Sequence, residues 1–225
     1  MSIAERRERD KRQRRDSIVD AAEKLFFARG FASVSVDEIA AAAEISKGTI
    51  YLYFKTKEEI SIEVARRGAR LLMDMSRAAV DAAPTGREKV RSLGRALLAF
   101  YERHPDHFKT LFYQHRGASC RSAAARDGDP LIEALIEDRR KLHDFGVGVV
   151  REAIADGSVR PDVDPVKATL ILVGMIIGLI RMVSVEEKAL LKRFHVTGSD
   201  LIKEAFELMD RPLGAARSMT PPEGP

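Results

Sequence analysis

The chain has 225 residues, of which 45% are hydrophobic and 32% charged, and it carries a formal net charge of +4. This composition is ordinary for a globular protein with a sizeable core. A single cysteine, Cys120, excludes an internal disulfide and suits a reducing compartment.

Neither secretion nor membrane insertion is expected. Residues 1–16 are charged and contain no apolar core of a signal peptide. The most apolar run, Ala168 to Ile180, is closed by Arg181 and is shorter than the ~20 residues that span a bilayer. We therefore expect a cytoplasmic protein without a membrane partner.

The N-terminal region predicts a basic arm followed by a helix. Residues 1–13 form the arm, and the dense basic cluster consists of Arg6, Arg7, Arg9, Lys11, Arg12, Arg14 and Arg15. The arm is either solvated and frayed or in contact with phosphates. Ile18, Ala22, Leu25 and Phe26 then recur at helical spacing, and Gly30 suits a C-terminal cap.

Two short helices and a long one follow. Ser35-Val36-Asp37-Glu38 has the form of a capping box, and the helix it opens extends to Ala43. Ser46 can cap the next helix, which we expect to end near Lys55. A second capping box, Thr56-Lys57-Glu58-Glu59, starts a fourth helix that stops at Pro84.

The remaining chain also predicts helices. They open at Thr85, Pro105, Pro130, Pro165 and Thr197, and the helix from Pro165 ends near Ser184, before a short amphipathic piece around Leu190. Residues 116–129 predict a loop, and the tail from Pro212 predicts disorder. Because no segment predicts a strand, the fold class is all-α.

Residues 46–55 suit a helix that enters a DNA groove. Ile50 and Phe54, one turn apart, should face the core. On a helix that reaches Lys55, four residues then point away from the core, namely Gly48, Thr49, Leu52 and Tyr53. Lys47 and Tyr51 lie at the edges of the inward face. A tyrosine hydroxyl can donate to phosphate, and an aliphatic side chain can contact a thymine methyl group.

Other residues add to this pattern. Gly48 costs ~1 kcal/mol relative to alanine within a helix, and close approach to DNA is a reason for tolerating it. Ser35 and Lys57 lie at helix N-termini, where free N–H groups favour a phosphate oxygen. Taken singly, each residue is more often a cap, a packing residue or a solvated charge; their occurrence together favours DNA binding.

This region resembles the DNA-binding domain of TetR/AcrR-type transcriptional regulators. The resemblance runs from about Arg14 to Glu59 and is carried by Ile18-Val19-Asp20-Ala21-Ala22, Leu25-Phe26, Gly30-Phe31, Ser35-Val36-Asp37-Glu38-Ile39-Ala40, Ile45-Ser46-Lys47-Gly48-Thr49-Ile50-Tyr51-Leu52-Tyr53-Phe54 and Lys57-Glu58. Glu44 departs from it, since the family often has glycine in this turn.

The resemblance implies a three-helix, helix-turn-helix DNA-binding domain at residues 14–60 and a larger helical regulatory and dimerisation domain at 61–211. It implies a homodimer on a palindromic operator, released when a small molecule binds. It places Lys47, Gly48 and Thr49 near bases. The predicted DNA-binding residues are Ser35, Ser46, Lys47, Gly48, Thr49, Tyr51, Leu52, Tyr53 and Lys57.

The helix from Pro165 also favours a dimer, because it is apolar nearly all round and its Gly174 and Gly178 share one face. With the last helix it could form a four-helix interface, and burial within one subunit is the alternative. The predicted interface residues are Gly174, Ile177, Gly178, Leu201, Ala205 and Leu208.

Aromatic residues of the C-terminal part suggest a ligand pocket with few polar anchors. The candidates are Tyr101, Phe108, Phe112, His115, Arg116, His143 and Phe145. We predict no cofactor and no metal site, although His104 and His107 are three residues apart and Cys120 could sense oxidants.

The leading hypothesis is a ligand-responsive, dimeric repressor and not an enzyme, because no Walker loop, nucleophile elbow or dinucleotide fingerprint is present. The alternatives are a regulator that answers to a protein partner or acts as an activator, an enzyme with an incidental helix-turn-helix, and a DNA-compacting protein.

Overall fold

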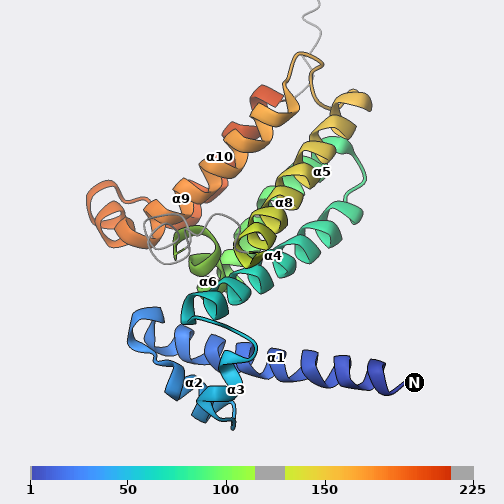
Figure 1. Cartoon of the computed structure of the whole chain (residues 1–225). Helices are drawn as coiled ribbons and strands as arrows, with labels where there is room; N and C mark the ends of the chain where they lie inside the picture. Colours follow the sequence, from blue (N-terminus) through green and yellow to red (C-terminus); the bar gives the residue numbers. More distant parts are fainter. Residues whose placement is uncertain (1, 115–129, 214–225) are drawn as a thin grey trace, which may run out of the picture. The chain divides into compact units, whose positions relative to one another are not determined.

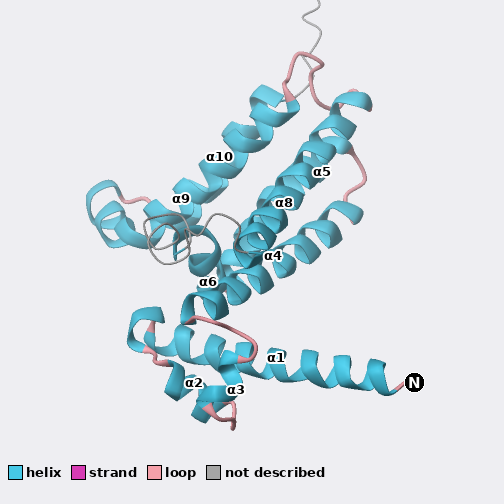
Figure 2. Ribbon diagram, in the orientation of Figure 1, coloured by secondary structure: helices cyan, strands magenta, loops and turns pink. Residues whose placement is uncertain are grey.

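A computed structural model describes residues 2–114 and 130–213, and the elements within these ranges are helical, as the sequence predicts (Figures 1 and 2). The helices are α1 (Ile3–Arg29), α2 (Val36–Ala42), α3 (Lys47–Tyr51), α4 (Lys57–Asp81), α5 (Gly86–Arg103), α6 (Pro105–Lys109), α8 (Pro130–Ala155), α9 (Pro165–Phe194) and α10 (Gly198–Leu213). A 3₁₀ turn, η1, covers Phe31–Ser33, and a π-helical turn, η2, covers Thr110–Gln114. The predicted loop at 116–129 and the predicted tail from residue 214 onward lie outside the described residues, whereas Pro212 and Leu213, which were assigned to the tail, end α10.

Three predicted helix limits were wrong. α1 begins at Ile3, because Ser2 and Glu5 form a capping box that starts the helix within the basic arm. α3 ends at Tyr51, where the N–H of Leu52 turns back to the carbonyl of Thr49. α9 continues through Ser184 to Phe194, so the amphipathic piece around Leu190 is its last part.

The length of α9 changes one expectation. Over Pro165–Glu186 the helix has a mean hydropathy of 2.3, and it is long and apolar enough to cross a membrane by length and composition. The apolar run counted in the sequence did not reach that limit, because it was taken to end before Arg181. Only 17% of the most apolar window of α9 is buried within this chain. Much of the apolar surface of α9 is therefore open to contact with a partner.

The described chain forms two compact units. The first comprises the described residues of 1–71 and 104–139, and the second comprises Leu72–Arg103 with the described residues from Arg140 onward. Apolar residues of α1 to α4 fill the core of the first unit, including Ile18, Ala22, Ile39, Ile50, Phe54 and Ile60. In the second unit, valines of α4, α5 and α8 pack around Ala153.

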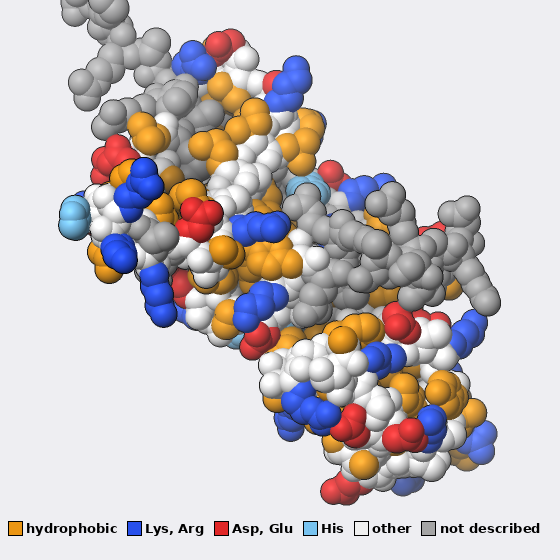
Figure 3. Space-filling view, turned by 90° about the vertical axis from the view of Figure 1, so that its left-hand side faces the viewer, with side chains coloured by type: hydrophobic (Ala, Val, Ile, Leu, Met, Phe, Trp, Pro, Cys, Tyr) orange, Lys and Arg blue, Asp and Glu red, His pale blue; other side chains and the backbone are white. Residues whose placement is uncertain are grey.

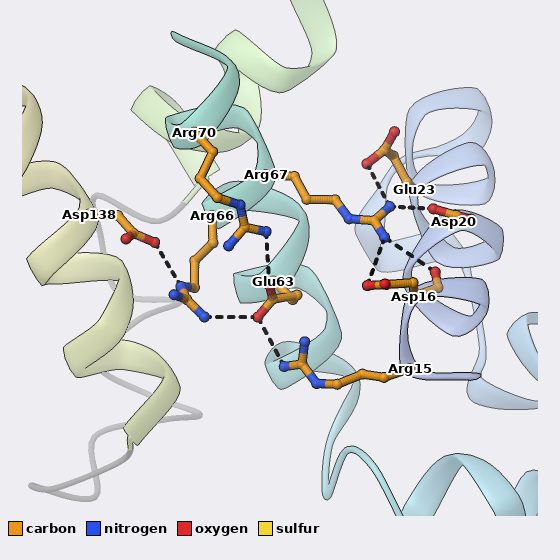
Figure 4. A network of polar contacts seen from close by, with 9 residues as sticks. All are labelled: Arg15, Asp16, Asp20, Glu23, Glu63, Arg66, Arg67, Arg70 and Asp138. Atoms are coloured by element: carbon orange, nitrogen blue, oxygen red, sulfur yellow. Dashed lines mark hydrogen bonds and ion pairs between the residues drawn. The ribbon is translucent and has the colours of Figure 1, made fainter. Parts of the chain in front are cut away.

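A buried carboxylate joins three helices of the first unit (Figure 4). The side chain of Glu63, on α4, is 5% exposed. Its Oε2 accepts hydrogen bonds from Arg15 Nη2 of α1 at 3.0 Å and from Arg66 Nη1 at 3.1 Å. Its Oε1 accepts from Arg70 Nη2 at 3.1 Å, and Arg66 Nε donates to Asp138 of α8 at 2.8 Å.

A second arginine of α4 extends this connection to α1. Arg67 donates hydrogen bonds to the Asp20 carboxylate and to the backbone carbonyl of Asp16. It also lies within ion-pair distance of Glu23, at 3.7 Å. Because α1 carries the three acidic residues and α4 the arginine, these contacts fix the two helices against each other.

The charges around Glu63 determine its protonation. Burial raises the pKa of the Glu63 carboxyl, but the hydrogen bond and charge of Arg15, with Arg70 and Arg66, outweigh it and lower the pKa to about 2. The folded state therefore binds this proton less readily than the unfolded chain does, for which the ordinary value is 4.5. Its contribution to stability is complete above about pH 4.5 and is lost as the pH falls towards 2.

The connection between α2 and α3 is a Schellman turn. The N–H of Ile45 donates to Ala40 O at 3.0 Å, and the N–H of Glu44 donates to Ala41 O at 3.1 Å. This places Glu44 in the left-handed region, with φ of 55°. Glycine is the favoured residue there, because a side chain in this conformation costs about 1–2 kcal/mol.

We predict that Glu63→Gln lowers the stability of the protein at neutral pH by about 3 kcal/mol, since it removes the negative charge that three arginines share and turns an amide N–H group toward at least one of them. The variant should also lose less stability than the wild type as the pH falls from 4.5 to 2. Chemical denaturation at several pH values measures both effects. Glu102→Gln, at an exposed position of α5, is the control, and equal pH profiles of Glu63→Gln and the wild type would contradict this role.

We predict that Glu44→Gly raises the melting temperature by roughly 2–4 °C, which corresponds to about 1 kcal/mol of relieved strain. Glu44→Gln keeps a side chain in the left-handed conformation and removes only the charge, so it should leave the melting temperature nearly unchanged. Calorimetry of both variants separates strain from charge. An equal rise in the two variants would show that charge, not backbone conformation, is responsible.

Candidate nucleic-acid interface

The short helix α3 presents an open surface on one side and core residues on the other. Ile50 and, after the helix, Phe54 are each 1% exposed, which confirms the predicted inward face. Tyr51 is 48% exposed and Leu52 is 80% exposed. A large apolar side chain so open to solvent has a physical reason when it meets a partner surface.

The prediction that Tyr53 points away from the core was wrong. Because α3 ends at Tyr51, the helical projection does not extend to position 53. The N–H of Tyr53 instead turns back to the carbonyl of Ile50, and its half-buried ring packs against the core of the first unit. Tyr51 is therefore the more open of the two tyrosines.

Two serines cap the helices of the motif. Ser35 Oγ accepts from the N–H of Glu38 at 3.2 Å, and Glu38 Oε2 accepts from the N–H of Ser35 at 2.8 Å. Ser46 Oγ accepts from the N–H of Thr49 at 3.1 Å and lies 2.8 Å from the Thr49 hydroxyl. The hydrogen bonds of Ser35 and of Arg29 lower the pKa of Glu38 to about 2.

An ion pair between α2 and α3 was not predicted from the sequence. Lys47 Nζ donates to Asp37 Oδ2 at 2.8 Å, and this hydrogen bond and the charge of Asp37 raise the pKa of Lys47. The two residues lie ten positions apart and on different helices, so the pair could be predicted only with knowledge of the turn that joins α2 and α3. Asp37 thus directs the lysine at the first turn of α3.

Lys57 has an internal role in this structure. Its Nζ donates to the carbonyls of Phe31 at 2.9 Å and Val34 at 2.8 Å, and it lies 4.3 Å from the centre of the Phe31 ring. These contacts tie the N-terminus of α4 to the segment before α2. Two of its three N–H groups are therefore used inside the unit.

Gly48 is exposed, and a Cβ built there meets only Ser46 Oγ, at 3.7 Å. Packing within the protein therefore does not require a glycine at this position. A reason for glycine must come from outside the chain, and close approach of a partner to the helix backbone is such a reason.

The predicted dimer residues lie on α9 and α10. Gly174 and Gly178 are exposed, with open space where a Cβ would lie at each, whereas Ile177 is half-buried. Exposed apolar residues continue the glycine face along α9, namely Val166, Leu170, Ile171, Met175, Met182 and Val185. On α10, Leu208 is exposed, while Leu201 and Ala205 are half-buried. Figure 3 shows hydrophobic side chains uncovered among charged ones on one face of the molecule.

The ligand candidates divide between the two units. In the first, Phe108 is fully buried and its ring centre lies 4.7 Å from that of Phe112. In the second, the Tyr101 hydroxyl bonds to Ser184 Oγ at 2.7 Å, Phe145 packs on the valine core, and His143 is exposed. His115 and Arg116 lie outside the described residues.

Comparisons with known proteins identify this arrangement. Residues 18–64 match the family described as "Bacterial regulatory proteins, tetR family". The HTH-type transcriptional repressor KstR2 of Mycolicibacterium smegmatis is 30% identical over 67% of this chain and 70% of that protein.

Solved structures agree in fold. The ketosteroid transcriptional regulator KstR2 of Mycobacterium tuberculosis aligns with a TM-score of 0.55 and 20% identity, over 89% of this chain and 95% of that chain. A TetR/AcrR regulator from Thermobifida fusca YX-ER1 aligns with a TM-score of 0.63 and 22% identity, over 88% and 97%. The chain therefore belongs to the TetR family of bacterial regulatory proteins, which are DNA-binding transcription regulators and not enzymes.

Proposed function

We propose that this protein is a cytoplasmic repressor that binds a palindromic operator as a homodimer and leaves it when a small molecule binds. The observation that carries the proposal is the open surface of α3, where Tyr51 and Leu52 face solvent next to Gly48. Repression is the action named for the relative KstR2 of Mycolicibacterium smegmatis.

The α3 surface offers both kinds of contact that a DNA reader needs. Lys47 and Thr49 lie in the first turn, where recognition helices reach base edges. The Tyr51 hydroxyl can donate to a phosphate, and Leu52 can contact a thymine methyl group. The helix caps, core packing and carbonyl contacts described above hold these residues in position, and they are made by Ser35, Ser46, Tyr53 and Lys57.

The open face of α9 supports a dimer. A second copy can cover the stripe that runs from Val166 to Val185, because Gly174 and Gly178 leave room for another helix backbone. A two-fold axis then repeats the same contacts on both subunits and sets two α3 helices on one DNA duplex. The same stripe accounts for the high hydropathy of α9 without a membrane.

The proposal is tested by selecting duplexes from a random pool with the full-length protein and by gel shift with DNA upstream of its own gene. We expect enrichment of a palindrome. Metabolite pools that raise the melting temperature and release this DNA would identify the effector class. Binding of all duplexes with equal affinity would instead indicate a DNA-compacting protein.

We predict that Lys47→Ala weakens binding to the selected duplex by about 1–3 kcal/mol and changes base preference, because the proposed docking brings the lysine near base edges. Tyr51→Phe removes one phosphate donor and should weaken binding to all duplexes alike. Competition titrations with point-mutated duplexes measure both.

Gly48→Ala should keep or raise the melting temperature yet weaken DNA binding, and unaltered binding would remove the close-approach explanation of this glycine.

We predict that the double variant Gly174→Glu/Gly178→Glu is a folded monomer, since both positions are open within one chain and the charges oppose burial against a second copy. Sedimentation velocity measures the mass, and circular dichroism measures the helix content. Arg151→Glu, at an exposed position of α8, is the control and should remain a dimer. A double variant with an unaltered dimer mass would place the interface elsewhere.

A further inference from the structure

The N-terminal half of α1 is a regular helix that lies beyond the packed part of its unit. Figure 1 shows α1 extending past α3 towards the N-terminus. The first buried residue of the helix is Ile18, and residues 2–14 are exposed. The capping box of Ser2 and Glu5 closes the free end, so the segment continues a helix already nucleated by the core.

Three basic residues of this segment lie on the same face as the core residues of α1. Arg14, Lys11 and Arg7 precede Ile18 by four, seven and eleven residues, which is the spacing of one helix face. Ile18 is fully buried against the core that α2, α3 and α4 share. The face that is apolar beside the core thus becomes basic beyond it, and we call Arg7, Lys11 and Arg14 the α1 basic strip.

The strip has no ion-pair partner in the part of the chain that the structure describes. Within residues 2–114 and 130–213, no acidic side chain lies at ion-pair distance from Arg7, Lys11 or Arg14. The next basic residue shows the contrast, because Arg15 bonds to Glu63 and lies 4.7 Å from the centre of the Phe54 ring. The strip therefore begins at Arg14, directly before the arginine that contacts Phe54, and continues towards the N-terminus.

We propose that the α1 basic strip binds DNA phosphates outside the bases read by α3. This proposal rests on the proposed operator binding. Guanidinium and ammonium groups neutralise phosphates without reading sequence. At 1.5 Å per residue, the strip from Arg7 to Arg14 is about 10 Å long, enough for successive phosphates of one backbone. The contact adds affinity to specific and non-specific binding alike.

The test compares two triple variants of the full-length protein with equal loss of charge. The strip variant is Arg7→Gln/Lys11→Gln/Arg14→Gln, and the control is Arg6→Gln/Arg9→Gln/Arg12→Gln, whose residues are exposed on the other faces of the same helix. Glutamine has a helix propensity close to that of arginine and lysine, and circular dichroism checks that α1 is retained. The probes are the selected palindromic duplex and a random duplex, titrated over a series of salt concentrations.

For the strip variant we expect affinity for both duplexes to fall by about tenfold or more, with the ratio between them unchanged. The slope of log K against log[salt] should become shallower by about 3 per subunit, whereas the control should keep most of the wild-type slope. The proposal would be overturned if the two variants lost DNA affinity equally or if neither lost it. It would also be overturned if the strip variant formed a weaker dimer in the absence of DNA. Failure of the wild type to prefer the palindrome would instead overturn the proposed function.

Discussion

The buried carboxylate of Glu63 is the contact on which the rest of the first unit depends. It receives arginines from α1 and from two further turns of its own helix, and one of these reaches α8. An apolar contact at this position would pack the helices but would not fix their rotation, whereas directed hydrogen bonds do. The cost of burying the charge is offset only because all the partners are in place.

The exposed surface of α3 follows from that arrangement through local geometry. α1 and α4 hold the core that buries Ile50 and Phe54, and the Schellman turn at Glu44 sets where α3 begins. With these inward residues fixed, Tyr51 and Leu52 have no place inside the unit. The exposed chemistry of α3 is thus a consequence of what its other face buries, and strain at Glu44 is part of its cost.

Much of this could be predicted from the sequence where the determinants are local. The caps at Ser35 and Ser46 and the inward face of Ile50 follow from spacing within a few residues. The end of α3 could not, because the turn at Leu52 competes with a helical pattern that continues in the sequence. The pairs of Arg15 with Glu63 and of Arg66 with Asp138 join residues 48 and 72 positions apart, and no local pattern selects such partners. Lys57 was expected to contact phosphate, but its ammonium group donates hydrogen bonds to the carbonyls of Phe31 and Val34.

The open face of α9 has a consequence for how the protein responds to its own abundance. If a second copy covers α9, as proposed, the subunit gains stability only as its partner becomes available, so folding and pairing share one dependence on protein concentration. At low abundance the chain is both less paired and more easily degraded. On the proposed palindromic operator, occupancy would then rise more steeply than in proportion to the amount of protein made. The uncovered stripe from Val166 to Val185 would in this way sharpen the threshold between an unbound and a bound operator.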